Sequence, residues 1–178
     1  LTWLLPAVSG LIFIGLWYGV RVVSGLQSWI LPTPGEIMAA AVHEHTRLLA
    51  AAGHTALGAL GGFLLAAILG FFTSLLLGLS KSLRASLYPW LLMLQMTPVI
   101  VLTPIIMLWA GPGMPGIITI TWLISYFPIV ANLTQGLLST DMNHVALFRM
   151  CNANRWQEVL LLRVPAALPY YLAGLRIA

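Results

Sequence analysis

Residues 55–80 read TALGALGGFLLAAILGFFTSLLLGLS, a run without a charged side chain. It exceeds the roughly 20 apolar residues that a helix needs to cross the hydrocarbon of a bilayer. Small side chains recur at every fourth position, namely Gly58, Gly62, Ala66, Gly70, Ser74 and Gly78. Residues four apart share one helix face, so the six form a continuous stripe. Close backbone approach along such stripes packs membrane helices together, and we predict that this span is a central packing post that a bulky residue at Gly62 or Gly70 would disrupt.

The composition around this run is that of a membrane protein. Of the 178 residues 60% are hydrophobic and 7% charged, and the mean hydropathy is +0.97, whereas soluble domains carry about 25% charged residues. Further charge-free runs cover residues 1–20, 85–111 and 112–140, and a fifth starts at 164. We therefore predict an all-α polytopic transmembrane helical bundle in a single domain, 1–178, that is a piece of a longer chain. The predicted spans are 3–22, 55–79, 86–110, 116–138 and an incomplete 166–178, with a polar segment at 139–165.

The net charge of +4 is distributed by link rather than along one face, which argues against a nucleic-acid partner. Five basic residues follow the second and fourth runs: Lys81, Arg84, Arg149, Arg155 and Arg163. The segment between the first and second runs, 21–54, carries two basic and two acidic residues. Lys and Arg are enriched in cytoplasmic links of membrane proteins. The sequence thus predicts that the links after the second and fourth runs are cytoplasmic and that residues 21–54 are external.

Prolines mark the external link and the third run. Thr33, Pro34 and Glu36 form a helix start with a hydroxyl cap, Pro at the first position and an acid in the first turn, which predicts a short helix to about Leu49. The third run contains Pro89, Pro98 and Pro104. Prolines free backbone carbonyls that lipid cannot satisfy, so this helix is expected to face protein or water where it kinks.

Polar residues in the third and fourth runs leave two interpretations open. The fourth run places Thr121, Ser125, Asn132 and Gln135 on one helix face, beside Pro128. Such residues either form hydrogen bonds between helices or line a polar pathway. The residues predicted for a pathway are Gln95, Thr97, Ser125, Asn132 and Gln135.

Segment 139–165 is predicted to be a docking surface for a soluble partner. Asp141 is suited to cap a helix, and Asn152 or Asn154 can adopt the left-handed conformation that ends one short helix before the next begins. Two short helices joined by an Asn turn would form a compact platform. The residues predicted to dock are Asp141, Asn143, Arg149, Asn152, Arg155 and Glu158.

Several kinds of chemistry are missing from the chain. The four acidic residues all lie in links, whereas ion-coupled carriers place carboxylates or His at membrane depth. The single lysine, Lys81, does not stand in a P-loop, and His43-Glu44-His45 lacks the zincin spacing. We therefore expect neither a catalytic residue nor a metal or cofactor on this chain, and no ATPase activity of its own.

The sequence from about Leu31 onward resembles permease subunits of bacterial binding-protein-dependent ABC importers, in the nitrate, sulfonate and taurine branch. The resemblance is carried by Leu31-Pro32-Thr33-Pro34, by Leu108-Trp109-Ala110-Gly111-Pro112-Gly113, and above all by Asn154-Arg155-Trp156-Gln157 with Val164-Pro165-Ala166-Ala167-Leu168-Pro169-Tyr170. Segment 139–165 then corresponds to the coupling loop of the family. Ala146-Leu147-Phe148 stands where the family has Glu-Ala-Ala, and Asn152 where it has Gly. The resemblance therefore implies the loss of a polar contact to the partner at the position of the Glu.

What the resemblance implies is a multi-pass subunit of the bacterial inner membrane. Its expected partners are a pair of ATPase subunits, a periplasmic or lipid-anchored binding protein, a second permease subunit and membrane lipid. The expected cargo is a small solute of the nitrate, sulfonate or taurine type, or a heterocyclic vitamin precursor. A channel or secondary carrier is the main alternative. A membrane-embedded enzyme and a structural scaffold are further alternatives.

Overall fold

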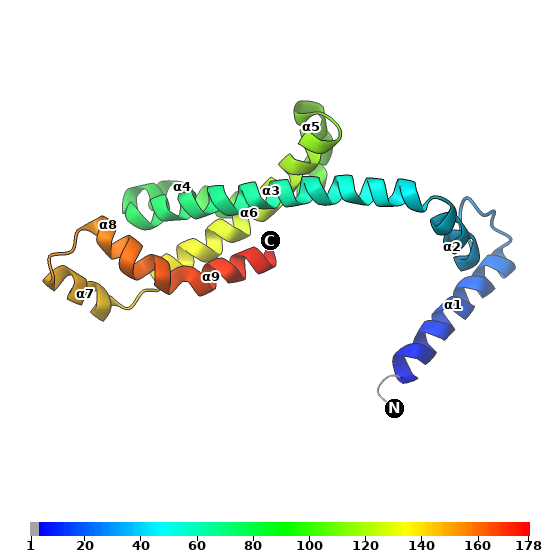
Figure 1. Ribbon diagram of the computed structural model, residues 1–178, viewed down its shortest axis with the longest axis horizontal. Helices are drawn as coiled ribbons and strands as arrows, with labels where there is room; N and C mark the ends of the chain where they lie inside the picture. Colours follow the sequence, from blue (N-terminus) through cyan, green and yellow to red (C-terminus); the bar gives the residue numbers. More distant parts are fainter. Residues whose placement is uncertain (1–3) are drawn as a thin grey trace. The chain divides into compact units, whose positions relative to one another are not determined.

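The computed structural model describes residues 4–178 as a set of helices, with no strand in that range (Figure 1). The described residues form two compact units, 4–53 and 54–178, and the division falls within α3. The elements are α1 (Leu4–Ser24), α2 (Pro34–His43), α3 (His45–Leu79), α4 (Lys81–Gln95), α5 (Val99–Ala110), α6 (Met114–Leu138), α7 (Met142–Met150), α8 (Arg155–Gln157), the π-helical η1 (Glu158–Arg163) and α9 (Val164–Ile177).

By length and composition, four helical stretches can cross a membrane: Leu4–Ser24, His45–Leu79, Met114–Leu138 and Arg155–Ile177. The bent pair of α4 and α5 makes a fifth if it is counted as one span. The all-α membrane fold is thereby confirmed. The predicted span 3–22 begins at residue 3, which lies outside the described residues, and α1 covers the rest of it.

The first unit is held together by α2 and the turn before it. Thr33 caps α2 in a reciprocal capping box with Glu36, and Pro34 occupies the first turn, as predicted. Hydrogen bonds from the Thr33 backbone N–H and then the Ser28 hydroxyl hold the pKa of the Glu36 carboxyl below its usual value. Trp17 Nε1 donates to the Pro32 carbonyl over 3.1 Å, which ties α1 to the turn.

The predicted end of the external helix near Leu49 is wrong. The helix ends at His43, with Glu44 as its C-cap, and α3 begins at His45. Residues 45–54 therefore belong to the long helix, whose 35 residues span about 52 Å at 1.5 Å each. Residues 44–46 carry no proline or glycine that would indicate a helix boundary.

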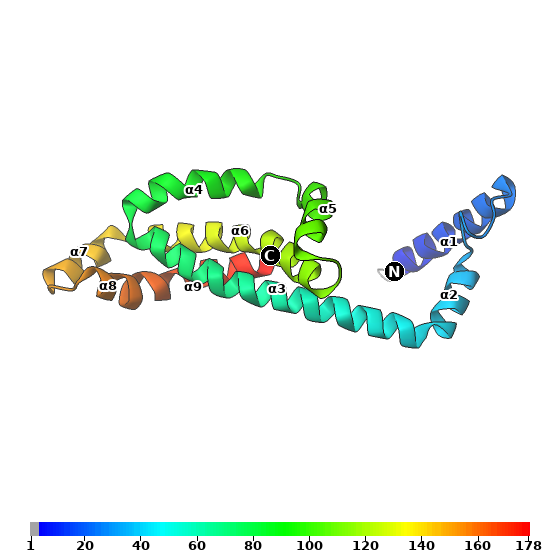
Figure 2. The same cartoon turned by 90° about the horizontal axis from the view of Figure 1, so that it is seen from above.

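In the second unit, the small-residue face of α3 packs on α6 (Figure 2). Gly58 lies against Ile117, Gly70 against Ile129 and Gly78 against Leu137, each 59 residues later in the chain. A constant offset along two helices means that they run parallel. At Gly62 the contact is closest, because a Cβ there would lie 2.5 Å from the carbonyl oxygen of Ile118 and 2.7 Å from the Cβ of Thr121. Ser74, which is fully buried, donates to the Gly70 carbonyl of its own helix and to Val130 across the contact.

The third run forms two helices rather than one kinked span. The axes of α4 and α5 are bent by 99° at residues 96–98. The break lies at Thr97-Pro98, where proline disfavours helical backbone in the residue before it and supplies no N–H. Pro89 and Pro104 lie inside α4 and α5 without ending them. Together α4 and α5 lead from the end of α3 back to the start of α6 (Figure 2). This return is needed because α6 runs parallel to α3.

Helix α9 packs along α6 and closes the core of the second unit. Leu75, Leu133, Leu137, Val159 and Ala167 form one buried apolar cluster from α3, α6, η1 and α9. Tyr171 of α9 contacts Phe71 edge to face and donates its hydroxyl to the Ala67 carbonyl. The core therefore joins α3 to both α6 and α9.

Candidate functional site

The two basic links lie at the same end of the second unit, where they line one cavity of about 520 Å³. All five basic residues that follow the second and fourth runs contribute: Lys81, Arg84, Arg149, Arg155 and Arg163. Because α3 and α6 run parallel, their last turns lie at the same end of the unit. The residues that follow α3 and those that follow α6 therefore line the same cavity, although Arg84 and Met142 are 58 residues apart in the sequence. Glu158 is the acidic residue in this lining.

Glu158 is the centre of a charge cluster beneath the cavity. Its Oε1 accepts hydrogen bonds from Arg163 Nη2 and Nε at 2.5 and 2.9 Å, and its Oε2 lies 3.5 Å from Arg149 Nε. The side chains of Glu158 and Arg163 are 9% and 16% exposed. Because a π-helix closes between residues five apart, η1 places residues 158 and 163 on one side. The π turn therefore makes this ion pair possible.

Two of the arginines also donate hydrogen bonds to carbonyl groups at the ends of α3 and α6. Arg84 Nη1 donates to the Leu77 carbonyl near the end of α3, and Arg163 Nη1 donates to the Leu137 carbonyl near the end of α6, each over 3.2 Å. The last carbonyls of a helix carry partial negative charge and lack partners within it. Arg84 and Arg163 thus have a structural role at the helix ends.

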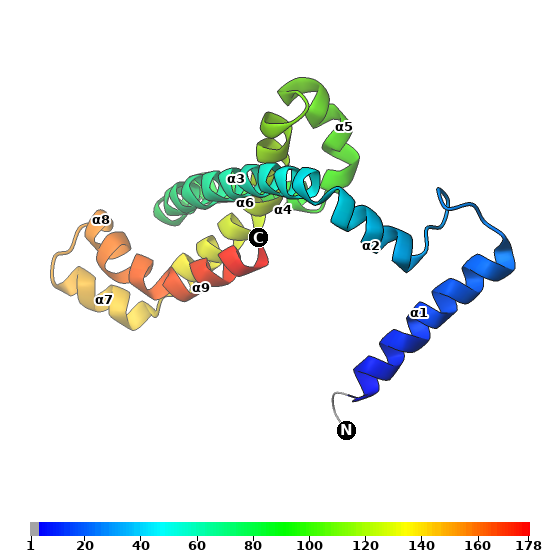
Figure 3. The same cartoon turned by 45° about the vertical axis from the view of Figure 1, so that its right-hand side comes forward.

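The platform beyond the cavity has the predicted form of two short helices joined by an Asn turn (Figure 3). Asp141 caps α7 by accepting a hydrogen bond from the Asn143 N–H. Asn152 follows α7 with a φ of +56°, the non-glycine residue with positive φ among residues 4–178. Asn154 then caps α8 in a reciprocal capping box with Gln157. Asn152 is therefore the left-handed residue that ends α7, and Asn154 is the cap that begins α8.

The predicted docking residues differ in their exposure. Asp141, Asn143, Arg149, Asn152 and Arg155 are exposed on the platform, but Glu158 is buried. Glu158 forms ion pairs with Arg163 and Arg149 within this chain, and its docking role stays a prediction.

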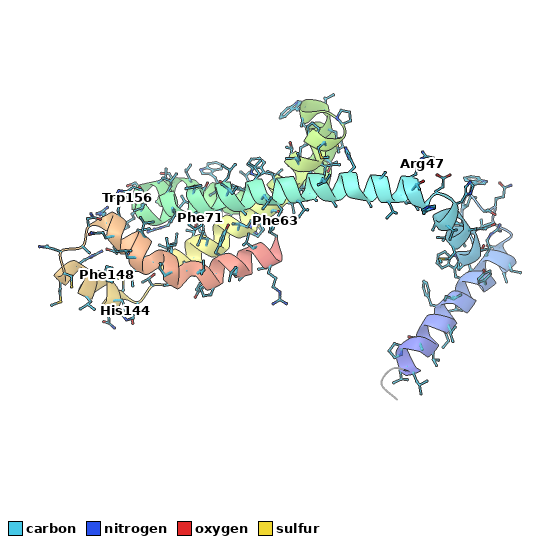
Figure 4. All side chains as sticks on the ribbon, viewed as in Figure 1. Arg47, Phe63, Phe71, His144, Phe148 and Trp156 are labelled. Atoms are coloured by element: carbon cyan, nitrogen blue, oxygen red, sulfur yellow. The ribbon has the colours of Figure 1, made fainter. Side chains whose placement is uncertain are left out.

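Exposed apolar side chains on the same platform were missed by the sequence reasoning. Met150 is 84% exposed, Met142 68%, Trp156 59% and Leu147 56%. Figure 4 labels Trp156 on α8, and His144 and Phe148 on α7. Leu147 stands within the Ala-Leu-Phe that replaces the Glu-Ala-Ala of the resembled family, where it adds to the exposed apolar surface of the platform.

The predicted pathway residues are not gathered into one lining. Ser125 is buried and its hydroxyl lies 3.4 Å from the Ala178 carbonyl, while Asn132 donates to the Pro128 carbonyl of its own helix and contacts Gly174. Both therefore face α9 and serve packing between helices. Gln95 and Gln135 are exposed, and Thr97 is half-buried at the α4–α5 break. Of the polar residues on this face of α6, Ser125 and Asn132 thus contact α9 and its end, whereas Gln135 is exposed.

Residues 62–178 match the family model of the binding-protein-dependent transport system inner membrane component. The chain belongs to this family. The match begins at Gly62, the closest point of the α3–α6 contact, and includes the platform and α9. Membership in this inner membrane component family agrees with the resemblance found in the sequence and with a transporter subunit rather than an enzyme.

Individual relatives in this transport family carry different names. The formylaminopyrimidine transport permease protein ThiX of Halalkalibacterium halodurans is 41% identical over 93 residues, which is 52% of this chain and 37% of ThiX. The riboflavin transport system permease protein RibX of Chloroflexus aurantiacus is 33% identical over 177 residues, 95% of this chain and 64% of RibX. The putative aliphatic sulfonates transport permease protein SsuC of Bacillus subtilis is 31% identical over 99 residues, 54% and 36% respectively. The chain thus spans between about a third and two thirds of these relatives.

Proposed function

We propose that this chain forms the membrane-spanning part of an ATP-driven importer of the inner membrane and couples transport to a separate ATPase pair. The platform of α7 and α8 is the observation that carries the proposal. It extends the end of the bundle that holds the basic links, which the positive-inside rule assigns to the cytoplasm. The further partners we propose are an external binding protein and a second permease subunit.

The proposed coupling surface combines exposed apolar and exposed cationic side chains. Leu147, Met150 and Trp156 are exposed and apolar, and Arg149 and Arg155 lie between them in the sequence. Protein interfaces draw most of their energy from aromatic, Met and Arg anchors of this kind. Displacement of α7 and α8 would reach the core through η1, because Val159 packs with Leu133 and Leu137 of α6.

The proposed cargo is a small solute. The named relatives transport a formylaminopyrimidine, riboflavin or aliphatic sulfonates, which supports a sulfonate-type anion or a heterocyclic vitamin precursor. The pathway candidates that remain after the helix contacts are assigned are Gln95, Thr97 and Gln135, at or near exposed surfaces of α4, α6 and the break.

Copurification of the full-length protein with the ATPase encoded beside it tests the coupling role. Asn152→Pro fixes φ near −65° where the structure has +56°, and Arg155→Glu reverses an exposed charge on the platform. We expect both variants to release the ATPase, and we expect Arg155→Glu to do so while the permease keeps its melting temperature. Arg47→Glu, which changes an exposed arginine outside the platform, is the matched control and should retain the ATPase. If the wild type binds no ATPase, the importer function is wrong and ATP-independent flux in liposomes is the next measurement.

A further inference from the structure

The cavity between the two basic links is lined by more cationic side chains than the carboxylate and helix ends around it can pair. Five cationic side chains and one carboxylate line it, a formal excess of four positive charges around about 520 Å³. Arg163 is paired with Glu158, and Arg84 is bound to the end of α3. Lys81 and Arg155 make no side-chain hydrogen bond or ion pair within residues 4–178. Arg149 is 65% exposed and reaches Glu158 only at 3.5 Å.

The remaining cations converge from separate parts of the chain. Lys81 opens α4, Arg149 lies in the last turn of α7 and Arg155 begins α8. Held around one space, these like charges repel one another, and the repulsion is relieved when an anion enters. The volume falls within the roughly 300–1,000 Å³ typical of small-ligand sites. The arrangement is therefore suited to a compact anionic group with several oxygen acceptors.

The cavity lies where a lipid headgroup would be found. Its lining includes Leu79 and Leu138, the last residues of α3 and α6, and both helices are long and apolar enough to cross a membrane. The end of such a helix lies near the boundary between hydrocarbon and headgroups. Met142 and Val159 add apolar wall beside the cations. A ligand that fits both parts of this lining has a phosphate attached to an apolar body.

We propose that this cavity binds the phosphate group of an anionic phospholipid from the leaflet on the platform side. Lys81, Arg149 and Arg155 contact the phosphate, while the Glu158–Arg163 pair forms the fixed floor. Leu138 and Met142 contact the glycerol and the start of the acyl chains. Basic pockets between membrane helices on the cytoplasmic side are suited to such headgroups. The lipid would then join the α3–α4 corner to the platform, so that its binding stabilises the platform against the bundle.

A titration of the full-length permease, purified in a neutral detergent without the ATPase, tests this site. The probes are dihexanoyl phosphatidylglycerol, dihexanoyl phosphatidylcholine and inorganic phosphate, with bound lipid counted by native mass spectrometry. We expect phosphatidylglycerol to bind about tenfold or more tightly than phosphatidylcholine, and its affinity to fall as salt is raised. Equal affinity for the two lipids, or an affinity independent of salt, would overturn the proposal.

Variants assign the binding to the cavity. Lys81→Gln and Arg155→Gln should each weaken phosphatidylglycerol binding about fivefold, and the double variant about 25-fold. Arg47→Gln removes an equal charge from an exposed site elsewhere and should leave the affinity unchanged. An equal loss in Arg47→Gln would show general surface attraction and refute the site. Full displacement of the lipid by an equal concentration of inorganic phosphate would refute a phospholipid as the ligand.

The ATPase provides the final discrimination. Because the lipid titration uses the permease alone, its result does not depend on the importer function. We expect Lys81→Gln to lose lipid affinity while it still copurifies with an ATPase that the wild type binds. If this variant instead releases the ATPase and binds phosphatidylglycerol as the wild type does, the cavity receives an acidic group of the partner protein and the lipid proposal is wrong.

Discussion

Two adjacent glycines of α3 offer a controlled test of the α3–α6 contact. A Cβ on Gly62 would lie 2.5 Å from the carbonyl oxygen of Ile118 and 2.9 Å from the Trp122 nitrogen, whereas a Cβ on Gly61 would meet Ile118 side-chain atoms at 3.6 Å or more. Ordinary C···O contacts are about 3.3–3.6 Å. Gly62→Ala therefore forces α6 away by about 0.5–1 Å, because two of the three nearest atoms that its Cβ meets belong to the α6 backbone.

The cost can be worked from that displacement. A gap of this size forfeits about a quarter to a half of the dispersion energy, and over roughly 50 atom pairs at ~0.15 kcal/mol each the loss is about 2–4 kcal/mol. Replacing helical Gly by Ala returns up to about 1 kcal/mol. Gly62→Ala should thus destabilise the protein by about 1–4 kcal/mol, while Gly61→Ala should be neutral or stabilising by up to about 1 kcal/mol.

Thermal unfolding of the full-length protein in detergent measures the difference. With about 2–4 °C for each kcal/mol in a chain of this size, Gly62→Ala should melt several degrees below the wild type and Gly61→Ala at or slightly above it. Both variants have the same composition and change neighbouring positions of one helix. Equal melting temperatures for the two would refute the parallel α3–α6 contact as described.

The platform yields three further predictions. Glu158→Gln should lower the free energy of unfolding by about 2–3 kcal/mol, because the largely buried Arg163 loses its charged partner, whereas Glu44→Gln in an exposed pair should change it by less than about 0.5 kcal/mol; chemical denaturation would show whether the two differ. Asn152→Gly should leave the α7–α8 turn intact, while Asn152→Ala should cost about 1 kcal/mol and speed limited proteolysis at residues 151–154, and equal cleavage rates would count against the left-handed turn. Cys151 is exposed and the one cysteine of this chain, so a membrane-impermeant maleimide should modify it in inside-out vesicles and leave it unmodified in right-side-out ones.

What could be predicted from the sequence followed from local patterns. The small residues at every fourth position of α3 predicted its packing face. Asp141 caps a helix and Asn152 adopts a left-handed conformation, as their side chains favour. Each of these depends on contacts within a few residues. The partner of the small-residue face could not be predicted in the same way, because the offset of 59 residues to α6 is set by the path of α4 and α5.

The features that the sequence left undetermined share a physical origin. The burial of Glu158 depends on the π turn of η1, and no residue in Glu158–Arg163 indicates five-residue rather than four-residue hydrogen bonding. The three prolines of the third run were equal in the sequence, but only Pro98 ends a helix, while Pro89 and Pro104 are accommodated. Ser125 and Asn132 have the polarity of a pathway lining, and their contacts with α9 became evident only in three dimensions. In each case tertiary packing selected between local alternatives.

Two independent arguments place the links after α3 and α6 on the same side of the membrane. Charge counting assigns the links after α3 and α6 to the same side because five of the chain's eight basic residues are there. Helix geometry gives the same relation without using charge, because parallel helices joined by one returning segment must end on the same side. A cysteine placed at Ser28, in the link assigned to the opposite side, should therefore be labelled in the reverse vesicle orientation to Cys151. Labelling of both positions from one side would contradict the charge rule for this chain, although the parallel packing of α3 and α6 would still hold the two basic links together.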